Sequence, residues 1–183
     1  MFENIKIKRV DLDHFEKVEK FLYLQCKCCY QNRIDDKRFS QIKARLKCEI
    51  MMARSALFGA FIGDELVGCI FIGEYDKRIK ILHDQVCGNV AEISRCYVKA
   101  ELRRMGIGKA LFRKALKFAK NYDYEQLYLH THYFLPGGFL FWKSVGFDVV
   151  LDEKDDWQTV HMQLMLKQNI NFYGRKCGGH ERI

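Results

Sequence analysis

AEISRCYVKAELRRMGIGKALFRKALKFAK, residues 91–120, is the stretch that decides the fold. A strand-like run at residues 90–98 leads into a basic turn with two glycines, and a helical pattern follows the turn. The apolar side chains of this pattern recur every three or four residues, which places them on one helix face. They are Ile107, Leu111, Ala115, Phe118 and Tyr122. The stretch therefore predicts a strand, a turn and an amphipathic helix in direct succession.

The turn has the features of an anion-binding site. The first amides of a helix lack partners within the helix, and the peptide dipoles place partial positive charge there. Gly106 and Gly108 carry no Cβ atom, so a ligand can approach the backbone closely. Arg103, Arg104 and Lys109 add full positive charges. We therefore predict a phosphate or pyrophosphate site, with a basic turn that binds no ligand as the alternative.

Two common phosphate-binding motifs are absent. The chain has no P-loop sequence, and the third glycine of the dinucleotide fingerprint is replaced by Leu111. What remains, Arg103-x-x-Gly106-x-Gly108, resembles the acetyl-CoA signature of the GNAT superfamily of N-acetyltransferases. The strand-like residues 126–132 and the segment FWKSVGF at 141–147, similar to the family's Phe-Tyr-x-x-x-Gly-Phe, follow in the family's order. The resemblance spans about residues 58–166.

This resemblance implies an α/β (α+β) fold and acetyl-CoA as co-substrate. The fold would be a mixed, mostly antiparallel central sheet of about seven strands flanked by about four helices. In the family, the fourth and fifth strands splay apart, so the fourth strand offers unpaired backbone groups to the pantetheine arm. The turn amides then hold the pyrophosphate. The cofactor-binding residues implied here are Cys96, Tyr97, Val98, Arg103, Arg104, Met105, Gly106, Ile107, Gly108 and Lys109.

Composition fits one globular domain. The 183 residues are 49% hydrophobic and 14% aromatic, and we expect a domain at 1–167 with a loose basic tail at 168–183. The net charge of +8 fits an anionic cofactor, and a basic tail alone does not indicate nucleic-acid binding. Without a secretory signal or a membrane-length apolar run, we expect a cytoplasmic protein whose eight cysteines are free thiols. A homodimer is left open.

The rest of the chain reads as alternating strands and helices. Strands are expected at 5–10, 56–62, 66–75, 147–151 and 157–166, and helices from about 15, from about 36 and at 136–145. Gly63-Asp64 predicts a tight hairpin, Asp35 or Asp36 an N-cap, and Gly146 a helix stop. Residues 76–89 show no pattern and indicate a connection. By the resemblance, residues 30–52 line the acceptor site, although we assign their apolar side chains to the core outside the loop at 30–33.

Glu92 is the candidate general base. The run Ala91-Glu92-Ile93-x-x-Cys96 resembles the histone-acetyltransferase branch of the family, in which a glutamate at this offset from the glycines is the base. Strand alternation would place Glu92, Ser94, Cys96 and Val98 on one face of the sheet. The alternative is a structural ion pair between Glu92 and Arg95 or a nearby lysine.

The general acid of the family is missing. Trp142 stands where many members carry the tyrosine that protonates the leaving thiolate, and an indole cannot do this. Leu135 replaces an asparagine that meets the cofactor in many members. Tyr133, His130 or a water molecule could supply the proton, or none is needed. His130 is therefore a second candidate catalytic residue, although a structural role is the commoner fate of such a histidine. His130 and His132 show no third ligand, so we expect no metal site.

The sequence thus predicts an acetyl-CoA-dependent N-acetyltransferase that acts by direct attack of an amine in a ternary complex. The acceptor, a small molecule or a protein, is not identified. Acidic residues could line its entrance; these are Asp35, Asp36, Asp152, Glu153, Asp155 and Asp156. The alternative function is a catalytically inactive acyl-CoA sensor or interaction module, which the missing tyrosine supports.

Overall fold

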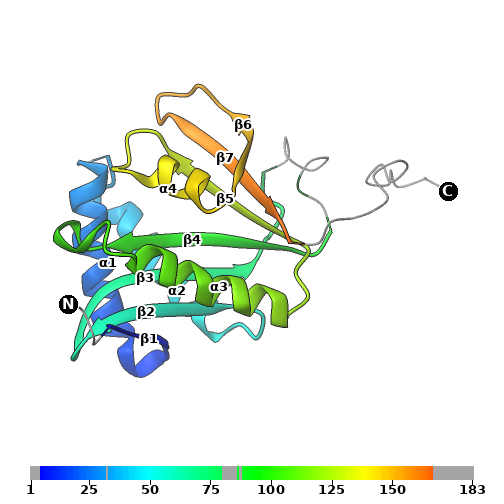
Figure 1. Ribbon diagram of the computed structural model, residues 1–183. Helices are drawn as coiled ribbons and strands as arrows, with labels where there is room; N and C mark the ends of the chain where they lie inside the picture. Colours follow the sequence, from blue (N-terminus) through cyan, green and yellow to red (C-terminus); the bar gives the residue numbers. More distant parts are fainter. Residues whose placement is uncertain (1–4, 32, 80–85, 87, 167–183) are drawn as a thin grey trace, which may run out of the picture.

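One seven-stranded sheet carries helices on both faces in the computed structural model, which describes residues 5–31, 33–79, 86 and 88–166 (Figure 1). This confirms the expected fold class. The strands are β1 (Ile5–Arg9), β2 (Ala56–Ile62), β3 (Glu65–Glu74), β4 (Val90–Val98), β5 (Gln126–His132), β6 (Asp148–Asp152) and β7 (Thr159–Met165). The α-helices are α1 (Phe15–Tyr30), α2 (Asp36–Met51), α3 (Ile107–Asn121) and α4 (Gly138–Ser144), and single turns of 3-10 helix lie at Leu12–His14 and Ala100–Leu102.

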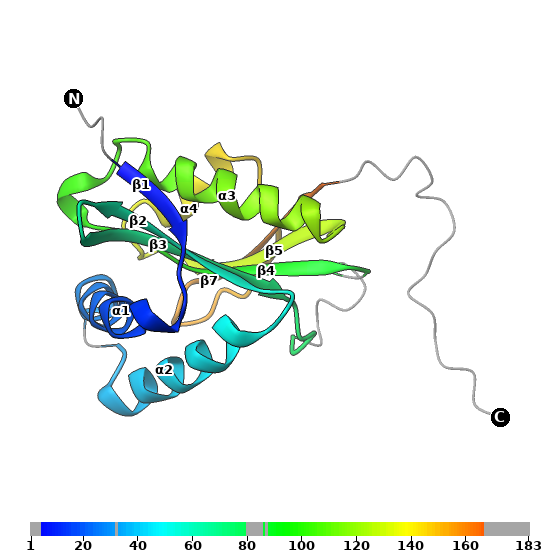
Figure 2. The same ribbon diagram turned by 90° about the horizontal axis from the view of Figure 1, so that it is seen from below.

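The sheet runs in the order β1-β2-β3-β4-β5-β7-β6. Every neighbouring pair is antiparallel except β4 and β5, which are parallel because the α3 crossover joins them. Figure 2 shows α3 and α4 on one face of the sheet and α1 and α2 on the other. The molecule therefore has three layers, and each helical layer needs an apolar face toward the sheet.

Helix α3 packs on the sheet through the face that the sequence predicts. Ile107, Leu111, Ala115 and Phe118 are buried in the larger core cluster, and Tyr122 packs partly buried against it. On the opposite face, α1 and α2 bury a second cluster against β2 and β3. Here Asp35 is the N-cap of α2, because its Oδ1 accepts the backbone N–H of Arg38 at 2.7 Å.

Strand β4 contains a β-bulge that the sequence pattern does not predict. Arg95 and Cys96 together stand opposite Ile70 of β3, and Arg95 adopts a left-handed φ of 51°. Because the extra residue resets the alternation, the predicted shared face is wrong. Ser94 follows Glu92 on the face toward α1 and α2, and Tyr97 rejoins that face after the bulge. Cys96 and Val98 instead pack toward α3.

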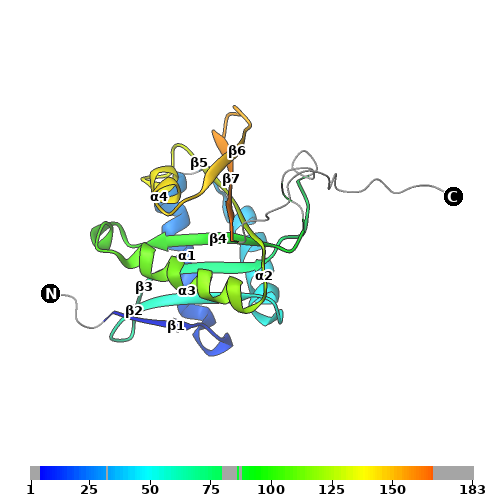
Figure 3. The same ribbon diagram turned by 45° about the vertical axis from the view of Figure 1, so that its right-hand side comes forward.

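Beyond the first part of β4, the strands β4 and β5 separate. They pair only at Val90, Ala91 and Glu92, opposite Gln126, Leu127 and Tyr128. Figures 1 and 3 show the two strands together at one end and diverging toward α4. Within the described residues, the β5-facing edge of β4 from 93 to 98 therefore has no strand partner, which confirms the splay implied by the resemblance.

The remaining element boundaries agree with the sequence to within one or two residues. Gly63 takes a φ of 57° in the β2–β3 hairpin, and Gly146 takes a φ of 99° after α4, as predicted. Helix α4 begins at Gly138 rather than at residue 136, because Gly137 has a left-handed φ of 73°. The predicted basic tail at 168–183 and residues 80–85 and 87 of the connection predicted at 76–89 lie outside the described residues. Six described cysteines are free, as expected.

Candidate active site

A pocket of about 630 Å³ opens on the face of the sheet that α1 and α2 cover. It lies beside the point where β4 and β5 diverge. Side chains from α1, α2, β4, β5 and β7 line it, together with the connections that follow β3 and β6. Both candidate catalytic residues, Glu92 and His130, belong to this lining. The two candidate catalytic side chains therefore lie in the same pocket.

Glu92 is almost fully buried and is held by an arginine. Both guanidinium nitrogens of Arg78 donate to its two carboxylate oxygens, one of them at 2.7 Å to Oε2. The alternative partner predicted from the sequence, Arg95, is wrong, because Arg95 pairs with Glu49 of α2 at 2.7 Å. Such a bidentate pair fixes the carboxylate in place. Glu92 is thus held in one orientation at the divergence of β4 and β5.

His130 faces Glu92 across the pocket. Its Nδ1 lies 3.8 Å from Oε1 of Glu92, and its side chain remains 40% exposed. Crowding by protein atoms lowers the pKa of His130 to about 4, because it disfavours the charged imidazolium; Glu92 opposes this effect, and Arg78 adds to it. His130 is therefore neutral near pH 7 and can accept a proton.

The other histidine at the pocket floor is fully used by the structure. His161 is buried, and its Nδ1 lies 2.7 Å from the Tyr128 hydroxyl while its Nε2 lies 2.6 Å from Oε1 of Glu153. A neutral ring satisfies both contacts when Nε2 donates and Nδ1 accepts. Both ring nitrogens of His161 are therefore engaged by the protein and are not available to a substrate. In this respect His161 differs from His130.

A chain of ion pairs closes one side of the pocket. Arg45 joins Glu49 at 2.5 Å and Asp76 at 3.2 Å, and Asp76 in turn contacts Arg78 at 2.8 Å. Together with the pairs of Arg95 and Glu92, this network ties α2 to β4 and to the connection after β3. No sequence pattern predicts this network, because its partners are up to 46 residues apart, between Glu49 and Arg95, and follow no shared period.

Two half-buried tyrosines also line the pocket: Tyr30, from the segment expected to line the acceptor site, and Tyr97, expected to bind the cofactor; neither was predicted as a proton donor. Burial raises the pKa of Tyr30 to about 12, and it raises the pKa of Tyr97 as well. Both hydroxyls therefore stay protonated at neutral pH and could donate a proton. Tyr133, a predicted alternative acid, is 43% exposed, lies outside the pocket lining and donates to Asp152 at 3.2 Å.

Trp142 belongs to the core rather than to the pocket. It is buried on the α3 side, with ring centroids 4.8 Å from Phe141, 5.4 Å from Phe147 and 6.1 Å from Phe112. These aromatic contacts fix the short helix α4 against α3. The residue at the family's tyrosine position is thus used for packing here.

The start of α3 leaves its first amides open. Its first intrahelical bond runs from the N–H of Ala110 to the carbonyl of Gly106, and no side chain caps the helix. Gly106 has a left-handed φ of 83°, and a Cβ atom built on it would meet nothing within 4 Å. A Cβ on Gly108 would instead lie 3.2 Å from the Phe141 ring. Gly106 thus borders open space, whereas Gly108 makes room for α4.

The basic residues of this turn differ in their contacts. Arg103 is anchored, because its Nε donates to the Val98 carbonyl at 3.2 Å and its Nη2 lies 3.5 Å from Sγ of Cys29. Arg104 is exposed and has a left-handed φ of 63°. Lys109 and Met105 are also exposed. The free edge of β4, this basic turn and the open amides of α3 follow one another along the chain, and the Arg103–Val98 contact ties the turn to the end of β4.

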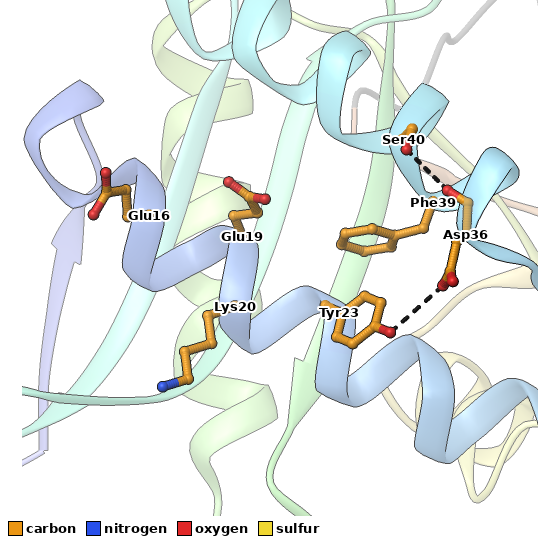
Figure 4. A pocket seen from close by; sticks show the side chains of 7 residues that line it. All are labelled: Glu16, Glu19, Lys20, Tyr23, Asp36, Phe39 and Ser40. Atoms are coloured by element: carbon orange, nitrogen blue, oxygen red, sulfur yellow. Dashed lines mark hydrogen bonds between the residues drawn. The ribbon is translucent and has the colours of Figure 1, made fainter.

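A second hollow, of about 460 Å³, lies between α1 and α2 on their outer side (Figure 4). Tyr23 and Phe39 meet there edge to face at 4.9 Å, and the Tyr23 hydroxyl reaches Asp36 at 3.4 Å. None of the candidate catalytic or cofactor residues lines it. Of the acidic residues that could line an acceptor entrance, Glu153 and Asp155 reach the main pocket, whereas Asp36 lines this outer hollow.

The lowered pKa of His130 predicts a pH dependence of stability. The unfolded chain, with the ordinary pKa of 6.5, binds this proton more readily than the folded protein does, so the free energy of unfolding falls as the pH drops from 6.5 toward 4. Burial lowers the pKa of His132 too, which adds in the same direction. When the pH is lowered from 7.5 to 5, we expect the thermal stability of His130→Asn to fall less than that of the natural protein. Differential scanning calorimetry at the two pH values measures both falls. Equal losses in both proteins would contradict a neutral, disfavoured imidazolium at this position.

Within the described part of the chain, no three His, Cys, Asp or Glu side chains gather as metal ligands. Among the same residues, no helix combines the length and apolar character needed to cross a membrane.

Comparisons with known proteins agree with this fold. The family model described as "Acetyltransferase (GNAT) family" matches residues 19–147. No curated protein sequence matches the chain. Solved structures share the fold at low identity. The PaiA N-acetyltransferase of Thermoplasma acidophilum, in complex with coenzyme A, is 23% identical with a TM-score of 0.69, and the match covers 88% of this chain and 99% of that one.

Two further structures extend the likeness. An acetyltransferase of the GNAT family from Staphylococcus aureus Mu50 is 17% identical with a TM-score of 0.73, covering 89% of this chain and 99% of that chain. YncA from Salmonella typhimurium, with its cofactor acetyl-CoA, is 14% identical with a TM-score of 0.68, covering 92% and 98%. At these identities the structures show a common fold.

Proposed function

Because the chain belongs to the GNAT family of acetyltransferases, we propose that it transfers an acetyl group from acetyl-CoA to an amine by direct attack in a ternary complex. The observation that carries this proposal is the position of Glu92. Strand β4 leaves β5 at this residue, so the unpaired edge of β4 begins beside a pocket that contains both Glu92 and His130. A donor on that edge and an acceptor in that pocket would meet at the divergence.

The described residues fit acetyl-CoA, which supplies a thioester-bound acetyl group. The free backbone edge at Cys96–Val98 suits the pantetheine arm, as an added strand would use it. The open amides of Ile107, Gly108 and Lys109 suit the pyrophosphate, and Gly106 leaves space in front of them. Arg103 and Arg104 add positive charge beside these groups.

His130 takes the proton in the proposed reaction. The amine nitrogen attacks the thioester carbon, a C–N bond forms, and the C–S bond breaks. Positive charge develops on the nitrogen as the C–N bond forms, which makes its protons more acidic, so a base with a low pKa suffices. Nδ1 of His130 lies toward Glu92, and Nε2 makes no hydrogen bond with the residues that the structure describes, so it can accept that proton.

Glu92 acts through His130 in this scheme. Its carboxylate, fixed by Arg78, stabilises the imidazolium that forms, much as a carboxylate does beside other catalytic histidines. Its two oxygens are already engaged, which favours this supporting role over direct proton transfer. The leaving thiolate could be protonated by a pocket tyrosine, because Tyr30 and Tyr97 retain their protons at neutral pH.

The test is release of free CoA from acetyl-CoA by the purified protein, followed with a thiol reagent against a pool of primary amines. Sustained release that requires an amine, with the acetylated amine identified by mass spectrometry, is expected. Binding of acetyl-CoA without release with any amine would overturn the proposal. It would then favour the inactive acyl-CoA sensor, for which the packing role of Trp142 is the supporting observation.

A further inference from the structure

We propose that the acceptor is a small amine that also carries a carboxylate or phosphate group, and that Arg33 and Arg38 bind this anionic group. The inference rests on the proposed acetyl transfer and names the substrate class of the same pocket. Both arginines line the pocket, Arg33 from the connection between α1 and α2 and Arg38 from the first turns of α2.

Every carboxylate that lines the pocket is already held by the protein. Glu92 is paired with Arg78, and Glu49 is paired with two arginines. Glu153 contacts His161, and both oxygens of Asp155 accept from Thr159, its backbone N–H at 2.7 Å and its hydroxyl at 2.9 Å. A cationic substrate would therefore have to share a carboxylate with the donors that already contact it, which makes these acids weaker anchors for a polyamine than unpaired carboxylates would be. The carboxylates concerned are Glu49, Glu92, Glu153 and Asp155.

The arginines of the pocket divide into two groups. Arg45, Arg78 and Arg95 are neutralised by carboxylates within the ion-pair network. Arg33 and Arg38 pair with no carboxylate among the residues that the structure describes; their polar contacts are with a backbone carbonyl and an amide oxygen. Neither guanidinium therefore has a direct ion-pair partner among those residues, and an anionic group on the acceptor would provide one.

Arg33 is held in a fixed orientation. Its Nη1 donates to the carbonyl of Asp156 at 3.1 Å, and its guanidinium lies 4.3 Å from the Phe134 ring centroid and 5.9 Å from that of Trp157. Stacking on aromatic rings leaves the remaining N–H groups at the edge of the guanidinium plane free to donate. A guanidinium that is already oriented loses little entropy on binding an anion, so it is a suitable anchor.

Arg38 supplies the second donor. It contacts Gln41 on its own helix at 3.1 Å, and its charge acts on the buried hydroxyl of Tyr30. The charge of Arg33 acts on His132 of β5 in the same way. The two guanidinium groups thus influence residues of the same pocket wall, because Tyr30 and His132 lie edge to face at 5.9 Å.

The pocket favours a small molecule over a protein segment. Arg33 ties the α1–α2 connection to the β6–β7 loop through Asp156, and this bridge spans 123 residues of sequence. This bridge joins two segments beside the pocket, and an amino acid or a phosphorylated amine fits within about 630 Å³. The amine end would then face His130, with the anionic end at the arginines.

The experiment compares matched amines with the natural protein and with Arg38→Gln. The probes are ω-amino carboxylates of increasing chain length, each beside the alkylamine of the same length; O-phosphoethanolamine beside ethanolamine separates phosphate from carboxylate, and spermidine represents polycations. Lys37→Gln is the control, because Lys37 is exposed on the same helical turn, carries the same charge and lies outside the pocket lining.

We expect the anionic amine of at least one pair to be acetylated about tenfold more efficiently than its neutral partner. Arg38→Gln should raise the KM for that amine about tenfold with little change in kcat, Arg38→Lys should restore part of the loss, and Lys37→Gln should have no effect. Preference for alkylamines or spermidine, or an Arg38→Gln protein that treats anionic amines as the natural protein does, would overturn the inference while acetyl transfer itself stands.

If no amine supports CoA release, the proposed function fails, and the arginine site is tested by binding. Calorimetric titration of the CoA-loaded protein with the same anionic amines should then show affinity that Arg38→Gln weakens and Lys37→Gln does not. Equal affinity for neutral and anionic probes would refute the site independently of catalysis.

Discussion

Replacing Gly106 with tryptophan is expected to weaken acetyl-CoA binding about 100-fold or more while the protein remains folded. The expected loss corresponds to two charge-assisted hydrogen bonds from the α3 amides, each contributing about 1.5 kcal/mol. A side chain at this position would project into the space that the pyrophosphate needs. Because a Cβ atom on Gly106 meets nothing within 4 Å, the substitution should not disturb the packing of the free protein.

The chain offers a matched control for the strain of this substitution. Gly63, in the β2–β3 hairpin, also has a left-handed φ, of 57°, and a Cβ atom there also meets nothing within 4 Å. Gly63→Trp should therefore destabilise the fold by the same backbone strain, about 1–2 kcal/mol, without changing the affinity for acetyl-CoA. Calorimetric titration with acetyl-CoA and thermal denaturation of both variants would separate blocking from destabilisation. Unchanged affinity in folded Gly106→Trp would remove the cofactor from this turn.

The sequence predicted this part of the fold well because its signals are local. The period of α3 is set by residues three and four apart, and all of the named apolar positions lie on the buried side. The strand β5 was predicted with its observed bounds, and the hairpin at Gly63 depends on one residue with a positive φ. The splay of β4 from β5 came from the family resemblance rather than from any pattern in these residues.

The face of β4 was predicted wrongly for a physical reason. Counting in twos assumes a regular pleat, and a bulge adds one residue to one strand only. Nothing about Arg95 marks it for a left-handed conformation, since arginine rarely adopts one. The bulge follows from how β3 and β4 pair, which is long-range information. Its consequence is that Tyr97, rather than Cys96, lines the pocket.

The partners of the pocket charges were equally unpredictable. Arg78 comes from a connection without periodicity, yet it determines the orientation of Glu92. Arg33 and Arg38 lie in or beside a loop that was expected to line the acceptor site, but whether a carboxylate neutralises them depends on contacts across the whole fold. Residue types indicated which chemistry is present, and the three-dimensional arrangement decided which arginines have a carboxylate partner.

His130→Asn is expected to lower kcat about 100- to 1,000-fold with little change in the KM for acetyl-CoA. Asparagine can retain a contact from its side chain toward Glu92, but it cannot accept the proton that leaves the amine. The loss should therefore appear in the chemical step. Steady-state kinetics with the best amine, together with the acetyl-CoA affinity of the variant, would show whether binding is preserved.

Glu92→Gln tests the division of roles between the two residues. If Glu92 only stabilises the imidazolium, the variant should lose about tenfold in kcat, and adding it to His130→Asn should cost almost nothing more, because the two side chains act as one unit. Glutamine keeps the shape of the side chain but leaves the buried guanidinium of Arg78 without its partner charge, so the folded fraction must be measured alongside. A loss of 100-fold or more in Glu92→Gln, beside an almost active His130→Asn, would reverse the assignment and make Glu92 itself the base. Full activity in both variants would exclude the pair from catalysis, because no proton acceptor in the proposed scheme would then remain.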